Sequence, residues 1–262
     1  MLISEIAGAL DNFRPVSLEE LDNSRLMDRI DTKYLISVDR VPELLNRMYG
    51  AYKVLEINDT RIFSYSTTYL DTADYLFFNQ HVTGRTERIK VRYRKYNTTG
   101  KTYLEVKSKI NGNRTIKSRI PHDLTPAIEP DIKASEFIAE HVPYKDLVLG
   151  PVLVNSFRRI TLAGSDICER ITIDTDLVYS DLSGKNTEFP YLAIIEHKRE
   201  RLSNGSPLTG ILKECNFHAT GFSKYCFGAA IMIDIPRKNI LKPKFLLINK
   251  IENEYHRNHE PW

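Results

Sequence analysis

Residues 85–119 read RTERIKVRYRKYNTTGKTYLEVKSKINGNRTIKSR, and this stretch decides the fold. It predicts three β-strands in succession, over residues 86–96, 101–110 and 113–120. The segment 97–100 forms the first turn, and Asn111-Gly112 is a strong signal for a two-residue hairpin turn. Within each strand, charged and apolar residues alternate. Since successive side chains of a strand point to opposite faces, each strand has a charged face and an apolar face.

The charged faces of the three strands are mostly cationic. Their members are Arg88, Lys90, Arg92 and Arg94 in the first strand, Glu105, Lys107 and Lys109 in the second, and Lys117 and Arg119 in the third. One interpretation is an antiparallel sheet with one solvated face. A solvated face normally mixes the two signs, however, because like charges on neighbouring strands repel. We therefore favour a face that binds a polyanion. If the sheet closes with this face inward, it forms a cationic tunnel that fits a linear phosphate chain.

Composition excludes several classes of protein. The 262 residues form one large domain or two small ones, and the net charge of +3 is too low for a general nucleic-acid binder. The three cysteines are scattered, which is typical of a reducing cytoplasm and not of a disulfide framework or a metal site. Residues 1–13 lack the features of a signal peptide, and the longest apolar stretch, 226–235, is too short to span a bilayer. We expect a cytoplasmic protein without direct membrane insertion.

The rest of the chain predicts a barrel with flanking helices. Residues 1–24 form a helical lead-in, in which Ser17-Leu18-Glu19-Glu20 has the pattern of a capping box. Residues 25–236 form the main domain, with about eight long, mostly antiparallel strands, which is about the number that closes a small barrel able to hold one ligand. Residues 237–262 form a polar, basic tail that we expect to be partly disordered. The predicted fold class is α+β, an eight-stranded antiparallel β-barrel with flanking helices.

Eight short motifs occur in a fixed order between Arg29 and Gly228. They are Arg29-x-Asp31-x-Lys33-Tyr34, Tyr69-Leu70-Asp71-Thr72, Lys90-Val91-Arg92-Tyr93-Arg94-x-Tyr96, Leu104-Glu105-Val106-Lys107, Lys117-Ser118-Arg119, Arg170-Ile171-Thr172-Ile173-Asp174-Thr175-Asp176, Ile195-Glu196-His197-Lys198 and Phe222-Ser223-Lys224-Tyr225. In this order they resemble the vacuolar transporter chaperone (VTC) polyphosphate polymerase domain. Each motif alone is weak, whereas eight in order are specific. The resemblance implies the fold of the triphosphate tunnel metalloenzymes, an eight-stranded antiparallel β-barrel.

The resemblance also implies a reaction, in which a metal-dependent phosphotransferase moves the γ-phosphate of ATP to a growing polyphosphate chain and releases ADP. The matching catalytic positions are Lys33, Arg92, Arg94, Lys107, Lys117, Arg170 and Lys224; Lys90, Arg119, Arg159 and Ser223 match substrate-binding positions, and Glu196 matches the metal ligand. A single carboxylate with phosphate oxygens and water is a normal arrangement for Mg²⁺ or Mn²⁺. Phosphoryl transfer requires mainly alignment and charge neutralisation, so no nucleophilic side chain is needed. The implied ligands are ATP and polyphosphate. Either a membrane partner passes the product across a bilayer, or the product stays in the cytosol.

Two other functions stay open. A tunnel triphosphatase would pass the γ-phosphate to water; such hydrolases usually start with Glu-x-Glu-x-Lys, whereas this chain has Arg29-x-Asp31-x-Lys33. A non-catalytic polyphosphate or nucleotide binder would have no use for an inward carboxylate such as Glu196. The eukaryotic members of the family carry a lysine just before Phe-Ser-Lys, where this chain has Gly221, so one phosphate ligand is missing at that end of the tunnel.

Several side chains allow two interpretations. Either Arg158 or Arg159 points inward, and the pattern does not decide between them. Asp174 and Asp176 are either second metal ligands or a structural pair at the end of a strand. Lys107 either binds phosphate or simply pairs with Glu105 across the barrel wall. His197 alternates away from Glu196, so we expect it to face outward.

Overall fold

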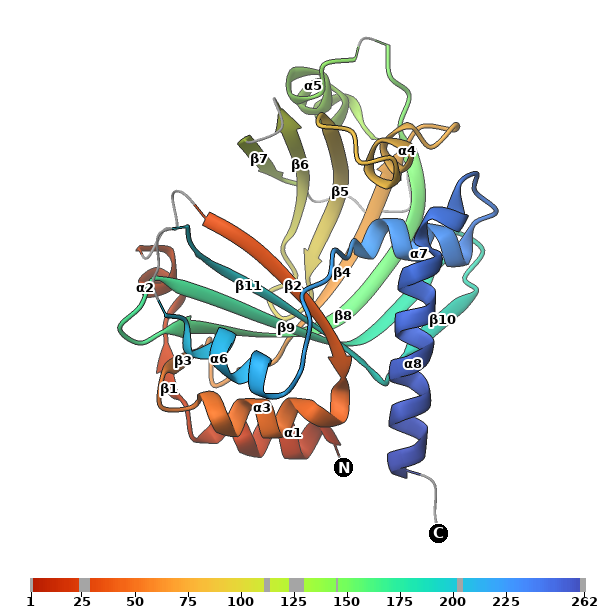
Figure 1. The fold of residues 1–262 in the computed structure, drawn as a ribbon. Helices are drawn as coiled ribbons and strands as arrows, with labels where there is room; N and C mark the ends of the chain where they lie inside the picture. Colours follow the sequence, from red (N-terminus) through yellow and green to blue (C-terminus); the bar gives the residue numbers. More distant parts are fainter. Residues whose placement is uncertain are drawn as a thin grey trace.

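The computed structural model describes residues 2–23, 29–110, 114–122, 130–144, 146–201 and 205–259 (Figure 1). Eight long strands form one curved antiparallel sheet. In spatial order they are β2 (Arg29–Ser37), β11 (Leu192–Glu200), β9 (Glu169–Ser180), β8 (Gly150–Gly164), β4 (Phe63–Asp71), β5 (Arg88–Tyr96), β6 (Thr102–Ile110) and β7 (Arg114–Pro121). Three short strands, β1 (Arg14–Val16), β3 (Tyr52–Leu55) and β10 (Asn186–Phe189), extend this sheet, and β1 and β3 pair in parallel.

The three strands that open the sequence analysis are confirmed as β5, β6 and β7. Register places Arg92 opposite Glu105, and Glu105 opposite Arg119, so the charged faces of all three strands lie on the same side. The apolar residues between them, such as Val91 and Leu104, are buried on the other side. The predicted Asn111-Gly112 turn lies outside the described residues, as does the boundary between residues 24 and 25.

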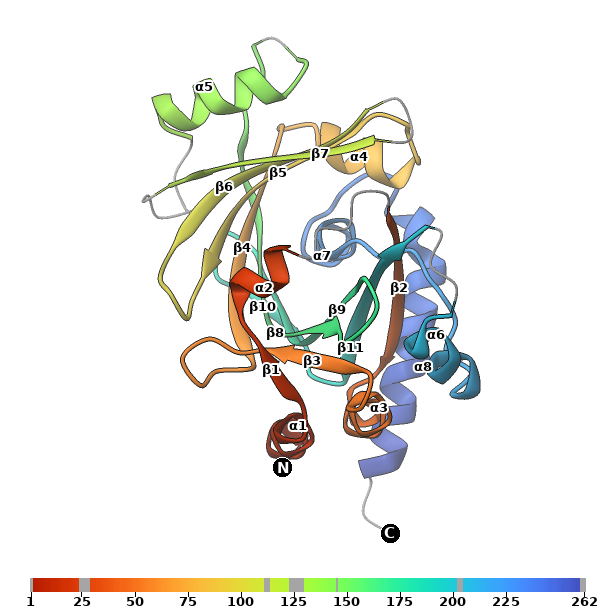
Figure 2. The ribbon, with the colours of Figure 1, turned by 90° about the vertical axis from the view of Figure 1, so that its left-hand side faces the viewer.

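The predicted closure of the barrel is wrong, although the predicted architecture of eight antiparallel strands with flanking helices is confirmed. The sheet has two ends, β2 and β7, and no pairing joins them within the described residues. Figure 2 shows the strands curving around a central region that α7 (Lys224–Met232) enters. Near the open seam, the backbone N–H of Thr220 donates to the carbonyl of Lys33 at 2.7 Å, so a loop and not β7 occupies part of the free edge of β2.

Most of the remaining helices flank the sheet (Figures 1 and 2). The remaining elements are α1 (Leu2–Asp11), α2 (Leu18–Asn23), the 3-10 turn Val38–Arg40, α3 (Val41–Met48), α4 (Leu76–Val82), α5 (Ile132–His141), α6 (Pro207–Glu214), the 3-10 turn Lys238–Leu241 and α8 (Lys242–His259). One buried cluster joins α1, α3 and α6 to β2, β8, β9 and β11. Another joins α5 and α4 to β5 and β6. None of the described helices is both long and apolar enough to cross a membrane.

The predicted capping box is confirmed at the start of α2. The backbone N–H of Glu20 donates to the hydroxyl of Ser17 at 3.1 Å, and the backbone N–H of Ser17 donates to the Glu20 carboxylate at 2.8 Å. Each side chain thus satisfies the backbone of the other, which is how this motif fixes a helix start. The helical lead-in therefore ends with a defined short helix.

The expected partial disorder of the tail is wrong. Residues 242–259 form α8, which packs against β2 and β11. Ile248 and Ile251 are buried in the same cluster as Leu35 and Tyr191. The helix is polar overall, and its buried apolar residues form only a narrow stripe. Composition alone therefore did not indicate a helix packed against the sheet.

We predict that Ile251→Ala lowers the free energy of unfolding by about 2–5 kcal/mol, because it removes a buried side chain and leaves a cavity. Leu246→Ala on the same helix is the matched control, since Leu246 is 60% exposed; it should change the free energy by less than about 0.5 kcal/mol. Urea unfolding curves of the two variants measure this difference. Equal small effects would mean that α8 does not contribute to the folded domain.

Candidate functional site

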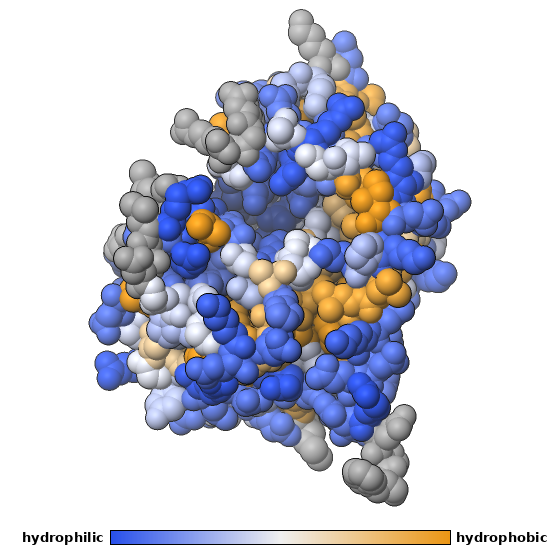
Figure 3. Space-filling view, in the orientation of Figure 1, coloured by the Kyte–Doolittle hydropathy of each residue, from blue (hydrophilic) through white to orange (hydrophobic). Residues whose placement is uncertain are grey.

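The cationic residues line the concave side of the sheet. Register places Lys90, Lys107 and Lys117 opposite one another on β5, β6 and β7, so three ammonium groups form a row across the sheet. Figure 3 shows a hollow lined by hydrophilic side chains in the region between β7 and β2. The predicted inward-facing cationic surface is therefore present, and it is reached through the open seam.

Glu105 is a buried carboxylate within this surface, with 1% of its area exposed. It accepts two hydrogen bonds from the Arg92 guanidinium, at 2.7 and 2.9 Å, and lies 2.8 Å from the Lys117 ammonium. Burial alone would raise the pKa of Glu105, but Arg92, Arg94 and Lys117 outweigh this effect and hold the pKa well below its usual range. Glu105 therefore stays ionised and fixes two cations, and it does not pair with Lys107.

Asp174 plays the same part on the opposite wall. Its carboxylate accepts a forked pair of hydrogen bonds from Arg159, at 2.5 and 2.7 Å, and a further one from Lys224. Burial would raise the pKa of Asp174, but Arg159 and Lys224 lower it to about 2. Arg159 is thus the inward arginine, whereas Arg158 is more exposed and lies beside Asp176. The structural interpretation of Asp174 holds, because both of its oxygens are occupied by cations.

The N-terminus of α7 brings three more polar groups to the site. Ser223 is the N-cap residue, and its hydroxyl accepts a hydrogen bond from the backbone N–H of Cys226 at 3.3 Å. The Lys90 ammonium donates to the same hydroxyl at 3.0 Å, and the Lys33 ammonium donates to the carbonyl of Phe222 at 2.9 Å. Residues from β2, β5 and α7, far apart in sequence, are therefore brought together here.

Burial lowers the pKa of several cationic side chains in the site. Desolvation lowers the pKa of Lys90 to about 7 and that of Lys107 to about 8. It lowers the pKa of Lys224 to about 8, against the opposing attraction of Asp174. Arg94 is 8% exposed, and its Nε has no hydrogen-bond partner within the described chain. These groups are surrounded by protein and by like charges, so an anion entering the site would stabilise their charged forms.

Glu196 is the carboxylate that suits a metal ion best. It lies on β11 opposite Lys33 and 3.2 Å from the Lys198 ammonium, and no arginine among the described residues forms an ion pair with it. Burial would raise the pKa of Glu196, but Lys198, Lys33, Arg159 and Lys224 hold it well below the usual value, so the carboxylate is ionised. The described residues contain no group of three or more potential metal ligands. One ionised carboxylate fits a divalent cation whose other ligands are phosphate oxygens and water.

Two predicted site residues have other partners. The Arg170 guanidinium donates to the carbonyl of Leu21 in α2, so it links the lead-in to the sheet. Arg119 lies over the ring of Tyr103, 5.0 Å from its centre.

His197 points away from Glu196, as predicted. It is nevertheless buried, because it lies 3.2 Å from Glu169 beneath the start of α6.

A comparison with family models matches residues 28–233 to the VTC domain. This match spans most of the chain. The chain belongs to the VTC domain family. The resemblance seen in the eight motifs is thereby confirmed, and no curated protein matches the chain.

Two solved structures that match this VTC domain have low sequence identity to it. A candidate adenylate cyclase from Bacillus halodurans is 14% identical with a TM-score of 0.47, over 75% of this chain and 94% of that one. A candidate adenylyl cyclase from Hippeastrum, with a dominant triphosphatase activity, is 15% identical with a TM-score of 0.48, over 80% of this chain and 98% of that one.

The sequence motifs of this VTC domain include two residues, Lys198 and Asp71, for which no place in the site was predicted. Lys198 lies on the same face as Glu196, two residues along β11, and alternation alone indicates that it belongs to the site. Asp71 is buried, and accepts hydrogen bonds from the backbone N–H groups of Phe77 and Phe78 and from the hydroxyl of Tyr225. No sequence signal connects Asp71 with α7, because the two are 154 residues apart.

We predict that triphosphate binds more weakly as the pH rises from 7 to 9 in metal-free buffer. Phosphate groups are already ionised well above about pH 6, whereas Lys90, Lys107 and Lys224 lose their protons as the pH passes through about 7 to 8. Binding above this range must therefore be accompanied by proton uptake. Calorimetry in buffers with different ionisation enthalpies measures both quantities. Lys90→Arg should shift the loss of affinity to higher pH, and a constant affinity from pH 7 to 9 would contradict the lowered pKa values.

We predict that Asp174→Asn lowers the free energy of unfolding by about 3–5 kcal/mol, because it leaves Arg159 and Lys224 buried without their counter-charge. Added triphosphate should raise the melting temperature of this variant more than that of the wild type, since phosphate oxygens replace the lost carboxylate. Asp176→Asn is the control, because Asp176 lies at a 3.7 Å distance from the exposed Arg158 and should contribute little. If triphosphate stabilises both variants equally, Asp174 does not occupy an anion position.

Proposed function

We propose that this VTC domain protein is a polyphosphate polymerase that transfers the γ-phosphate of ATP to the end of a polyphosphate chain and releases ADP. The observation that supports the proposal is the concave face itself. There, cations from β2, β8, β11 and α7 lie around the ionised carboxylate of Glu196, and cations from β5, β6 and β7 line the same face. A linear polyanion matches this distribution of charge along the strands, and family membership agrees with it.

The proposed reaction depends on alignment and on charge. Arg92 and Arg159 are held in fixed orientations by Glu105 and Asp174, so their remaining N–H groups can bind phosphate oxygens without further reorganisation. Lys90, Lys107 and Lys117 supply point charges along the chain. Arg94, with an unpaired Nε, is ready to stabilise the charge that develops on the transferred group. Glu196 would hold Mn²⁺ or Mg²⁺, which when bound neutralises charge on the phosphate oxygens.

The first strand favours transfer to phosphate over transfer to water. Arg29 stands where the hydrolase motif has its first carboxylate, and it lies 3.1 Å from the one carboxylate of this motif, Asp31. A tunnel hydrolase with Glu-x-Glu-x-Lys would supply free metal carboxylates from this strand. Glu196 in turn argues against a non-catalytic anion binder, because an ionised carboxylate opposes anion binding unless a metal ion bridges the two.

The purified protein is expected to make polyphosphate from ATP and Mn²⁺, with release of ADP. Products separated by chain length on a gel test this directly. Free phosphate as the sole product would establish the triphosphatase instead. Binding of ATP without any product would establish the non-catalytic binder, and a lack of binding would remove the function from this site.

We predict that Glu196→Gln abolishes polyphosphate synthesis and leaves triphosphate binding intact, or slightly tighter, in metal-free buffer. The substitution keeps the shape of the side chain and removes the charge that would hold the metal ion. Turnover is measured against Mn²⁺ concentration, and the melting temperature is measured in parallel. Glu140→Gln on the exposed side of α5 is the control and should behave as wild type. Normal turnover of Glu196→Gln at every Mn²⁺ concentration rules out this role.

A further inference from the structure

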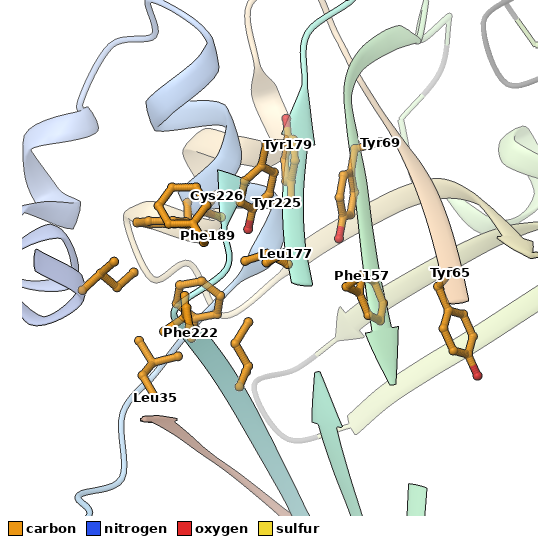
Figure 4. Close-up of a cluster of buried hydrophobic side chains, with 14 of the residues drawn as sticks. Leu35, Tyr65, Tyr69, Phe157, Leu177, Tyr179, Phe189, Phe222, Tyr225 and Cys226 are labelled. Carbon is orange, nitrogen blue, oxygen red and sulfur yellow. The ribbon is translucent and has the colours of Figure 1, made fainter. Parts of the chain in front are cut away.

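A row of aromatic rings continues from the cationic face toward the turn that joins β5 and β6. Phe157 and Tyr65 are stacked, with ring centres 5.4 Å apart and planes 9° from parallel. Tyr96 meets Tyr65 edge-on at 5.1 Å, and Tyr103 meets Tyr96 edge-on at 5.7 Å. Register places Phe157, Tyr65 and Tyr96 directly opposite one another on β8, β4 and β5. Figure 4 shows Phe157 and Tyr65 at one end of the buried apolar cluster.

The row lies on the same side of the sheet as the phosphate-binding cations. Tyr96 follows Arg92 and Arg94 at every second position of β5, and Tyr103 precedes Glu105 in the same way on β6. The two halves of the row differ in burial. Phe157 and Tyr65 are buried, at 2% and 9% exposure, whereas Tyr96 and Tyr103 are partly exposed.

Packing explains the buried half of the row but not the exposed half. Phe157 and Tyr65 fill the interior below Arg159, whose guanidinium lies 5.1 and 5.4 Å from their ring centres. Tyr96 and Tyr103 are instead partly exposed, on the side of the sheet that carries the strongly polar site. Arg119 lies over Tyr103 from the exposed strand β7. Aromatic rings flanked by a guanidinium are a common platform for a nucleobase, because every base has a flat π-face.

We propose that Tyr96, Tyr103 and Arg119 form the base subsite for a nucleoside triphosphate whose phosphates lie on the cationic face. The inference rests on the proposed function and names the donor substrate of the same site. Arg92 is four residues from Tyr96, about 13 Å along an extended strand. A ribose and its phosphates bridge such a separation, which brings the terminal phosphate to the cations beyond Arg94. Since stacking does not read hydrogen-bonding edges, ATP and GTP should bind alike, and both should bind more tightly than UTP, because a purine offers a larger face.

The experiment compares the dissociation constants of ATP and inorganic triphosphate by calorimetry in metal-free buffer. The variants are Tyr103→Leu and Tyr96→Leu, which keep an apolar side chain, and Tyr103→Phe, which keeps the ring. Tyr49→Leu is the matched control, because Tyr49 is 57% exposed and lies at the end of α3. Wild-type protein should bind ATP more tightly than triphosphate. Each Leu variant should weaken the binding of ATP about tenfold and leave the binding of triphosphate unchanged. Tyr103→Phe and Tyr49→Leu should bind both ligands as the wild type does.

The outcomes separate the two proposals. If wild-type protein binds triphosphate and ATP equally, and the Leu variants change neither, the proposed function survives and the base subsite is overturned. If the Leu variants weaken both ligands by the same factor, the rings only shape the phosphate channel, and the subsite is again overturned. If wild-type protein binds neither ligand, the proposed function fails, and the base subsite fails with it.

Discussion

Repulsion between like charges is the constraint on which the rest of this structure depends. A curved sheet brings the cations of its concave face closer together than a flat one would, and burial strengthens their repulsion. Two buried carboxylates, Glu105 and Asp174, relieve it by each holding an arginine and a lysine. Removing one member of such a group is costly, because the others are left as unpaired buried charges. The sheet therefore keeps its shape by placing a few negative charges within a cationic surface.

This arrangement divides the cations into two groups with different properties. Arg92, Lys117, Arg159 and Lys224 are bound to carboxylates, so they are ordered before any ligand arrives. Lys90, Lys107 and Arg94 have no carboxylate within ion-pair distance among the described residues, and burial lowers the pKa of each. The first group provides geometry, and the second gains most from an anion, because a nearby negative charge restores its preferred protonation. A polyanion entering through the seam would be stabilised mainly by the second group.

The sequence was sufficient for those features that depend on local pattern. Alternation placed Arg92 and Lys107 on the cationic face, and the spacing of Ser17 and Glu20 predicted a capping box that the structure contains. The place of Glu196 came from the resemblance to the family. Features that depend on register or on distant packing were not predictable in this way. Glu105 pairs with Lys117, which lies diagonally across from it in the β6–β7 register, and not with Lys107 on its own strand. The bond from Arg170 to the carbonyl of Leu21 joins distant parts of the chain, and no local pattern encodes it. Nor does a local pattern encode the open seam, where the described residues of β2 and β7 do not pair.

Asp71 helps to position Lys224, although Asp71 is not itself one of the cations of the site. Asp71 is 1% exposed, and it accepts hydrogen bonds from the N–H groups of Thr72, Phe77 and Phe78 as well as from the hydroxyl of Tyr225. Burial raises the pKa of Asp71, while these hydrogen bonds oppose the rise. Since Tyr225 is the neighbour of Lys224 in the first turn of α7, the Asp71 carboxylate fixes the end of that helix from behind. The ammonium of Lys224 can then pair with the Asp174 carboxylate on the far wall. Asp71, Asp174 and Lys224 are far apart in sequence.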